Sequence, residues 1–254
     1  MTLERRYLGS TGIEVSVIGL GTVKLGRRSG LKVAPFRVPT FRKAQKLIHR
    51  ARDLGINLID TAPAYGESEA LLGMLLKGER EHWVISTKAG ERHVDGVSLF
   101  DFSPESIRES VDESLVRLAT DYLDIVFVHS DGRDKKILEN RGTMDQLKEL
   151  KNAGKIRATG FSYKTLDGGE SALDSCDVIM ATLSKSNCHE STLVREAGVR
   201  GRGVLIKKAL DSGTAAPESL RHVADQPGVS SILVGTIDPF HLEADVTALS
   251  LDPI

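Results

Sequence analysis

Short apolar runs alternate along this chain with amphipathic segments, and that alternation constrains the fold more than any other feature of the sequence. The runs are rich in β-branched residues and cover positions 17–20, 56–59, 83–86, 124–128, 156–159, 177–180, 204–206 and 231–234. Near-continuous apolar strands that alternate with helices predict a parallel sheet covered by helices. Eight such units in 254 residues favour an α/β fold of the (β/α)8 TIM barrel class over an open doubly wound sheet, which usually has fewer strands.

The segments between the runs carry recognisable helix signals. Residues 41–54 place apolar side chains at three- and four-residue steps, which is typical of an amphipathic helix. Ser103-Pro104 predicts an N-cap followed by a proline in the first turn, and Asp238-Pro239 predicts the same for the last helix. Thr143-Met144-Asp145-Gln146 has the form of a capping box, and Gly154 follows where that helix should end.

The segment before the first run predicts a β-hairpin. Residues 6–8 and 13–15 flank Gly9-Ser10-Thr11-Gly12, a sequence rich in turn formers. We expect this hairpin to cap the bottom of the barrel. No linker, low-complexity tract or shift in composition divides the chain, so we expect residues 1–254 to form a single domain.

Composition excludes several classes of function. Lys and Arg number 34 against 35 Asp and Glu, a balance that argues against a nucleic-acid-binding surface. An apolar run of about 18 residues, which a membrane span needs, is not found, and no apolar stretch follows the first charged residues as in a secretory signal. Two cysteines and scattered histidines without ligand spacing predict no metal site. We expect a cytoplasmic protein that acts on a small molecule; the sequence identifies no protein partner.

Reactive side chains follow three neighbouring runs. Asp60, Lys88 and His129 lie at the C-terminal ends of the second, third and fourth runs, and Tyr65 lies in the loop after Asp60. The C-terminal ends of the strands form the active-site face of such a barrel. Singly, each residue has an ordinary structural interpretation, such as a turn former, a solvated charge or a packing residue. Their convergence on one rim favours a catalytic site.

These four residues have a coherent chemistry. Free tyrosine has a pKa of about 10, and a nearby ammonium group such as Lys88 is expected to lower the pKa of Tyr65. Asp60 would keep Lys88 charged, and His129 would hydrogen-bond a substrate oxygen. Tyr65 could then give a proton to a carbonyl oxygen while hydride arrives at the carbon, or take the proton back in the reverse reaction.

The chain resembles the aldo-keto reductase superfamily. The segments that carry the resemblance are Gly19-Leu20-Gly21-Thr22, Asp60-Thr61-Ala62-Pro63-Ala64-Tyr65-Gly66, Ile85-Ser86-Thr87-Lys88, Val126-Phe127-Val128-His129, Gly160-Phe161-Ser162 and Val234-Gly235-Thr236. The resemblance implies a (β/α)8 barrel that binds NADP(H) and interconverts aldehydes or ketones and alcohols. It assigns the catalytic tetrad to Asp60, Tyr65, Lys88 and His129.

The resemblance also implies a set of cofactor contacts. Residues near the nicotinamide and its ribose would be Gly21, Thr22, Asp60, Ser162, Tyr163, Met180 and Lys207. Lys208, Leu210 and Ser212 would lie along the pyrophosphate, and Gly235, Thr236, Ile237, His241 and Asp245 would hold the adenosine end.

The chain departs from the family pattern at several of these positions. Tyr163 stands in place of an Asn, Met180 in place of a Gln, and Lys207 in place of an aromatic residue. Ile237 replaces a common Arg or Lys, which removes a charge-assisted contact to the 2′-phosphate. NADP(H) is favoured, with Lys207 and Lys208 as compensating cations and NAD(H) as the alternative. Because no long loop follows Leu249, we expect an open site, partly covered by residues 27–39.

Two other functions compete with this interpretation. The departures are also consistent with a non-catalytic protein that binds a nicotinamide cofactor as a sensor or accessory subunit. A Schiff-base lyase would instead use Lys88 or Lys207 as an amine nucleophile. The complete set of Asp60, Tyr65, Lys88 and His129 favours the reductase.

Overall fold

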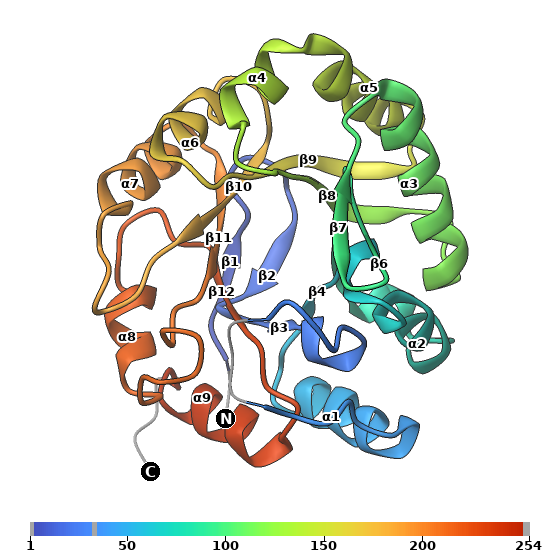
Figure 1. Ribbon diagram of the computed structural model, residues 1–254. Helices are drawn as coiled ribbons and strands as arrows, with labels where there is room; N and C mark the ends of the chain where they lie inside the picture. The colour runs from blue at the N-terminus through green and yellow to red at the C-terminus, as the bar shows by residue number, and fades with distance from the viewer. Residues whose placement is uncertain (1–2, 32–34, 251–254) are drawn as a thin grey trace.

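Eight parallel strands close into a barrel in the structure, a computed structural model that describes residues 3–31 and 35–250 (Figure 1). The barrel strands are β3 (Ile18–Gly21), β4 (Leu58–Asp60), β5 (Val84–Ala89), β8 (Leu123–His129), β9 (Ile156–Ser162), β10 (Val178–Thr182), β11 (Gly203–Lys207) and β12 (Ser231–Val234). Each pairs with its neighbour in chain order, and β12 pairs with β3 to close the ring. The predicted (β/α)8 barrel is confirmed, with all eight predicted strands in place.

Helices surround the barrel on its outside (Figure 1). They are α1 (Phe41–Asp53), α2 (Ser68–Leu75), α3 (Pro104–Leu118), α4 (Asp134–Glu139), α5 (Arg141–Asn152), α6 (Leu166–Ala172), α7 (Ser191–Val199), α8 (Ser219–Ala224) and α9 (Pro239–Thr247). Short 3-10 turns form at η1 (Val23–Leu25), η2 (Pro63–Tyr65) and η3 (Arg80–His82). In the part of the chain that the structure describes, none of the helices combines the length and apolar character needed to cross a membrane.

Most of the predicted helix ends are found. The Ser103 side chain accepts a hydrogen bond from the Ser106 amide, and Asp238 accepts one from the Phe240 amide, as N-caps do. Gly154 takes a positive φ of 76° just after α5 ends. The predicted capping box is wrong: α5 begins at Arg141, so Thr143 lies inside the helix and its hydroxyl donates to the Phe102 carbonyl at 2.6 Å.

The predicted N-terminal hairpin caps the bottom of the barrel. β1 (Arg5–Tyr7) and β2 (Glu14–Ser16) pair antiparallel, and the loop between them is anchored where the Ser10 amide donates to the Gly201 carbonyl. The hairpin buries three side chains against the inward-facing side chains of the strands. These three are Leu8, Ile13 and Val15. The bottom of the barrel is therefore sealed by apolar contacts, and the opposite end carries the polar residues.

A second hairpin, which the sequence analysis did not predict, follows β5. β6 (Glu91–Val94) and β7 (Val97–Phe100) pair antiparallel, and β6 packs against η2. The turn residues Asp95 and Gly96 have φ values of 50° and 83°, as a two-residue turn of type I′ requires. The hairpin lies outside the closed barrel, beside the end that carries η2 (Figure 1).

Substitution of Gly9 tests how the bottom hairpin is held. A Cβ atom on Gly9 would lie 2.4 Å from the Gly201 carbonyl oxygen, whereas one on Gly12 would meet no heavy atom within 4 Å. Both glycines have positive φ, so Gly12→Ala serves as a matched control for backbone strain. We expect Gly9→Ala to lower the free energy of unfolding by about 3 kcal/mol and Gly12→Ala by about 1 kcal/mol. Equal losses in urea denaturation would contradict a role for the close contact.

Candidate active site

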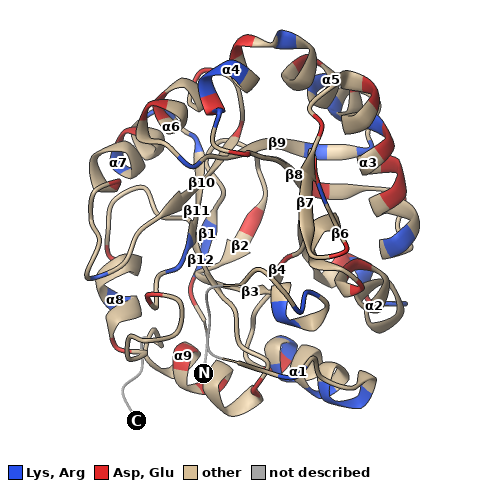
Figure 2. Ribbon diagram, in the orientation of Figure 1, with Lys and Arg blue, Asp and Glu red and all other residues tan. Residues whose placement is uncertain are grey.

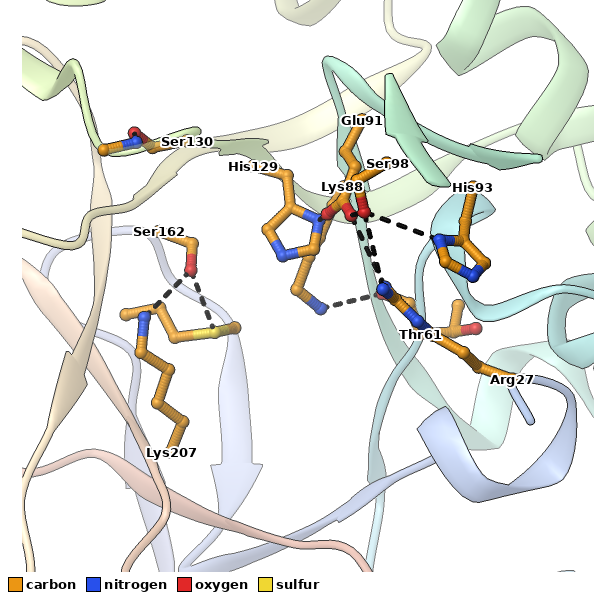
Figure 3. Close-up of polar contacts among 12 residues, drawn as sticks. Arg27, Thr61, Lys88, Glu91, His93, Ser98, His129, Ser130, Ser162 and Lys207 are labelled. Carbon is orange, nitrogen blue, oxygen red and sulfur yellow. Dashed lines mark hydrogen bonds and ion pairs between the residues drawn. The ribbon is translucent and has the colours of Figure 1, made fainter. Parts of the chain in front are cut away.

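A buried ion pair joins the C-terminal ends of β4 and β5. Lys88 is 2% exposed and Asp60 is 4% exposed. The Lys88 ammonium donates to both carboxylate oxygens of Asp60, each at 2.8 Å. It also donates to the Thr61 carbonyl at 2.9 Å (Figure 3). Burial opposes the charge on Lys88, but the Asp60 carboxylate and Tyr65 together outweigh it and raise the pKa of Lys88. Lys88 therefore remains an ammonium at neutral pH.

Tyr65 ends the η2 turn and faces this ion pair. The Lys88 nitrogen lies 4.8 Å from the centroid of the Tyr65 ring, and the Tyr65 and His129 rings meet edge to face with centroids 6.4 Å apart. Burial raises the pKa of Tyr65, and Lys88 offsets only part of that effect. Lys88 therefore acts on the pKa of Tyr65 in the predicted direction, but the net shift is upward because burial has the larger effect. Tyr65 keeps its proton at neutral pH.

His129 ends β8, and its ring is bordered by a carboxylate that the sequence analysis did not single out. Nδ1 of His129 lies 2.7 Å from a carboxylate oxygen of Glu91, although the ring N–H is not aligned along this contact. The other Glu91 oxygen accepts from Ser98 Oγ at 2.6 Å and from Arg27 at 3.4 Å (Figure 3). Burial opposes the Glu91 charge, but these three neighbours lower the pKa of Glu91 to about 2.

Burial also acts on His129, but in the direction that disfavours its positive charge. It lowers the pKa of His129, Glu91 partly restores it, and Lys88 and Lys207 lower it further.

Glu91 and Ser98 belong to the β6–β7 hairpin. The Asp95-Gly96 pair between alternating residues was the available sequence signal for that hairpin.

A second polar group lies across the mouth of the barrel from Lys88 and His129 (Figure 3). The Lys207 ammonium donates to Ser162 Oγ at 3.2 Å and to the Tyr163 carbonyl at 3.0 Å. Ser162 Oγ in turn lies 3.6 Å from the Met180 sulfur. Both partners of Lys207 are uncharged, and burial lowers the pKa of Lys207 to about 8.

The Tyr163 side chain points away from this mouth. Its hydroxyl donates to the Glu190 carboxylate, and its ring packs closely against Gly169 of α6. Because side chains alternate along a strand, the inward position of Ser162 turns the next residue outward. The structure therefore brings Ser162, Met180 and Lys207 together, while Tyr163 contributes its backbone carbonyl and a ring whose centroid lies 5.8 Å from the Lys207 nitrogen.

The loop after β11 has an unusual backbone. Lys208, Asp211 and Ser212 all take positive φ, at 62°, 47° and 63°. Non-glycine residues held in this region store strain and are concentrated at functional sites. Lys208 is exposed, and Leu210 packs against the outer core. The turn places residues of the predicted pyrophosphate segment at the same end of the barrel as Lys207.

The segment after β12 is short of positive charge. A Cβ atom on Gly235 would meet no heavy atom within 4 Å, so space lies beside this backbone. Thr236 is half-buried, Ile237 packs against the core, and His241 is exposed. Asp245 is 4% exposed, and burial raises its pKa to about 6. Figure 2 shows acidic and no basic segments on α9.

Gly21 ends β3 and Thr22 follows it, at the same end of the barrel. The Thr22 amide and hydroxyl both donate to the Asp60 carbonyl at 2.9 Å, which fixes the first strand end against the second. A Cβ atom on Gly21 would lie 3.5 Å from the Val234 carbonyl. These two residues thus link the end of β12 to the Asp60–Lys88 pair.

Residues 32–34 of the predicted covering segment 27–39 lie outside the described residues. Cys176 is buried and Cys188 is exposed, and neither is paired with another cysteine. Within residues 3–31 and 35–250, no three His, Cys, Asp or Glu side chains gather in a way that could hold a metal ion.

Comparison with curated proteins finds relatives among sugar and carbonyl oxidoreductases. L-galactose dehydrogenase from Arabidopsis thaliana is 37% identical over 204 residues, which cover 76% of this chain and 60% of that protein. NADH-specific methylglyoxal reductase from Escherichia coli is 40% identical over 176 residues, which cover 63% of this chain and 52% of that protein. The chain thus matches between half and two thirds of the length of these two relatives.

Comparison with solved structures covers more of the chain. A Pseudomonas aeruginosa protein assigned to the aldo-keto reductases superposes with a TM-score of 0.90 at 48% identity, covering 96% of this chain and 93% of that one. The holo form of an aldo-keto reductase from Bacillus halodurans has the same fold, with a TM-score of 0.87 at 24% identity over 99% of this chain and 92% of that one. Residues 17–199 match the sequence model of the Aldo/keto reductase family. The resemblance seen in the sequence is confirmed: this chain belongs to the Aldo/keto reductase family.

Proposed function

We propose that the protein is an NAD(P)H-dependent oxidoreductase that interconverts aldehydes or ketones and alcohols. The observation that carries this proposal is the meeting of a protonated Tyr65 with the Lys88–Asp60 pair and His129 at one end of the barrel. Family membership supports the same reaction class. The fold alone would not support it, because barrels of this type host many chemistries.

The residues at the mouth suit a nicotinamide cofactor. Ser162 and Lys207 present a hydroxyl and an amine with only neutral partners, which match an amide such as the nicotinamide carboxamide. The strained turn at Lys208, Asp211 and Ser212 has the backbone form of an anion-binding concavity. The open space beside Gly235 leaves room for a ligand along the adjoining rim.

The roles of the side chains follow from their charges. A reduced nicotinamide, when bound, supplies hydride to the carbonyl carbon. Tyr65 gives its phenolic proton to the carbonyl oxygen, so that the product is the neutral alcohol. The Lys88 ammonium, 4.8 Å from the ring, stabilises the phenolate that is left, and Asp60 keeps Lys88 charged. Solvent then returns a proton to Tyr65. His129 faces the same space and can hydrogen-bond the reacting oxygen.

For the choice of cofactor, the charges favour NAD(H). The 2′-phosphate of NADP(H) needs a cation, and Ile237 supplies none. Lys207, one of the two compensating residues, is engaged inside the barrel by Ser162 and Tyr163. Glu243 of α9 pairs with Arg50 of α1 at 2.7 Å, so this arginine is already engaged, and the neighbouring Asp245 would repel a phosphate. We therefore propose NAD(H) as the preferred form, and NADP(H), favoured from the sequence, is the alternative outcome of the test below.

The substrate is proposed only as a class. One relative is named as a sugar dehydrogenase, another as a methylglyoxal reductase and a third, from Microbacterium luteolum, as a pyridoxal dehydrogenase. All three names describe small carbonyl or alcohol compounds, and we propose the same class here. The expected cytoplasmic location and the single domain over residues 1–254 stay predictions.

Replacement of Tyr65 tests the reaction. We expect Tyr65→Phe to lower kcat for aldehyde reduction by about 100-fold or more, because the proton donor is lost, while cofactor binding is kept. Turnover of a panel that includes methylglyoxal and pyridoxal measures the first effect, and nicotinamide fluorescence measures the second. Tyr7→Phe, at a residue 66% exposed, is the matched control.

The outcomes of this experiment separate the three candidate functions. Unchanged turnover in Tyr65→Phe would refute the proposed role of Tyr65. Cofactor binding without turnover of any carbonyl or alcohol by the wild-type protein would support the sensor. Borohydride trapping of a substrate on Lys207 but not on Lys207→Met would support the lyase, for which a pKa of about 8 is suited.

Replacement of Ile237 tests the cofactor preference. We expect the wild-type protein to bind NADH more tightly than NADPH in parallel fluorescence titrations. Ile237→Arg should tighten NADPH binding by about tenfold, the effect of about one charge-assisted hydrogen bond, and leave NADH binding nearly unchanged. Ile237→Gln controls for the loss of the apolar contact. Tighter binding of NADPH by the wild-type protein would contradict the proposal.

A further inference from the structure

The β6–β7 hairpin places a buried carboxylate beside His129, and the four proposed catalytic residues do not account for it. Glu91 is 6% exposed. One of its oxygens is engaged by Ser98 Oγ at 2.6 Å and Arg27 at 3.4 Å. The other lies 2.7 Å from Nδ1 of His129. Glu91 is therefore held in place, and its second oxygen is directed at one nitrogen of the imidazole ring.

That contact decides which nitrogen carries the proton. A bare Nδ1 would hold a nitrogen of partial negative charge 2.7 Å from a carboxylate oxygen, which is repulsive even though the ring is not aligned along the contact. A hydrogen on Nδ1 makes the same contact attractive. A neutral imidazole has only one N–H, so placing it on Nδ1 leaves Nε2 bare.

We propose that Glu91 is a positioning residue that fixes His129 in the tautomer with the proton on Nδ1, so that Nε2 of the neutral ring is a hydrogen-bond acceptor. The consequence for turnover rests on the proposed function, whereas the tautomer itself can be measured without turnover. A bare Nε2 accepts a hydrogen bond from an alcohol but cannot donate one to a carbonyl oxygen. Only the imidazolium form of His129 can donate to the carbonyl.

The charge of His129 therefore couples the direction of the reaction to pH. The groups that act on His129 are Glu91 from β6, Lys88 from β5 and Lys207 from β11, with the Tyr65 ring at its edge. Glu91 raises the pKa of His129, while burial and the two lysines lower it, and the net direction is downward. Carbonyl reduction should thus weaken as pH rises through this lowered pKa, and alcohol oxidation should not.

The groups that face Glu91 itself do not weaken this coupling. They are His129, Ser98 and Arg27, with the Tyr65 hydroxyl farther away, and together they keep the pKa of Glu91 near 2. Glu91 is therefore negatively charged across the pH range in which His129 titrates. His93 reaches this group only through Ser98, at 3.4 Å.

The tautomer can be read by nitrogen NMR of protein with 15N-labelled histidine. The His129 signals are assigned by their loss in His129→Asn. Above its pKa, wild-type His129 should show a protonated Nδ1 and a bare Nε2. In Glu91→Gln the carboxylate charge is absent, so a substantial share of the ring should shift to the Nε2-protonated form. Glu109→Gln, at an exposed residue of α3, is the matched control and should leave the His129 signals unchanged.

The kinetic test uses 4-nitrobenzaldehyde and its alcohol with NADH or NADPH. Removing the Glu91 charge lowers the pKa of His129, so in Glu91→Gln the pH midpoint for reduction should move down by about 1–3 units. Above the midpoint, kcat/KM for reduction by the wild-type protein should fall about tenfold for each pH unit. In Glu91→Gln the fall should level off, because neutral rings with the proton on Nε2 can still donate to the carbonyl. Ser98→Ala keeps the charge of Glu91 and should move the midpoint much less.

Several results would overturn the proposal. A wild-type His129 with its proton on Nε2, or unchanged His129 signals in Glu91→Gln, refutes the positioning role whatever the enzyme does with carbonyls. If Glu91→Gln does not fold, the wild-type tautomer and Ser98→Ala still decide. If neither compound turns over while the Nδ1 proton is found, the proposed function fails and the role of Glu91 stands.

Discussion

The buried pair of Lys88 and Asp60 is the interaction on which the rest of the site depends. Two charges removed from water are tolerated only when their remaining hydrogen-bonding capacity is used. Here Ser86 Oγ donates to Asp60 at 2.6 Å and the Thr61 carbonyl accepts from Lys88. The parallel register sets Asp60 opposite Ser86, and Lys88 lies two residues further along the same strand and hence on the same face. The pairing of β4 with β5 thus assembles the ion pair.

The same pair shapes the behaviour of its neighbours. The Lys88 ammonium donates to both oxygens of Asp60 and to the Thr61 carbonyl, and its nitrogen lies 4.8 Å from the centroid of the Tyr65 ring. Burial raises the pKa of Tyr65 more than Lys88 lowers it, so the phenol keeps its proton at neutral pH. A protonated tyrosine beside a fixed ammonium is prepared to give up a proton at the moment when negative charge develops on a substrate oxygen.

The sequence predicted the parts of the molecule that depend on local pattern. All eight barrel strands, the bottom hairpin and the caps at Ser103 and Asp238 were expected, because periodicity and turn chemistry are written into short segments. The position of Asp60, Lys88 and His129 on one rim of the barrel was expected, because each lies at the C-terminal end of a predicted strand. Their actual distances required the register between strands.

The features that were missed depend on tertiary contacts. Glu91 is distant in sequence from His129, and it reaches the ring because β5 pairs with β8 in a register that sets Ala89 opposite Val128. The raised pKa of Tyr65 results from burial that no single segment specifies, and the contact of the Tyr163 hydroxyl with Glu190 joins two distant segments. Thr143 had the right residue type for a cap, but a hydrogen bond to Phe102 from another loop employs its hydroxyl instead.

The β6–β7 hairpin stands apart from the barrel it serves. It is joined to β5 and α3 at its two ends and forms its own two-stranded sheet, so the ring of eight strands closes without it. A change in its length or sequence would leave the barrel core and the Lys88–Asp60 pair intact while altering what borders His129. The barrel is thus a scaffold whose stability does not depend on the hairpin. Sequence changes in the hairpin could alter the pKa of His129 without a change in the barrel.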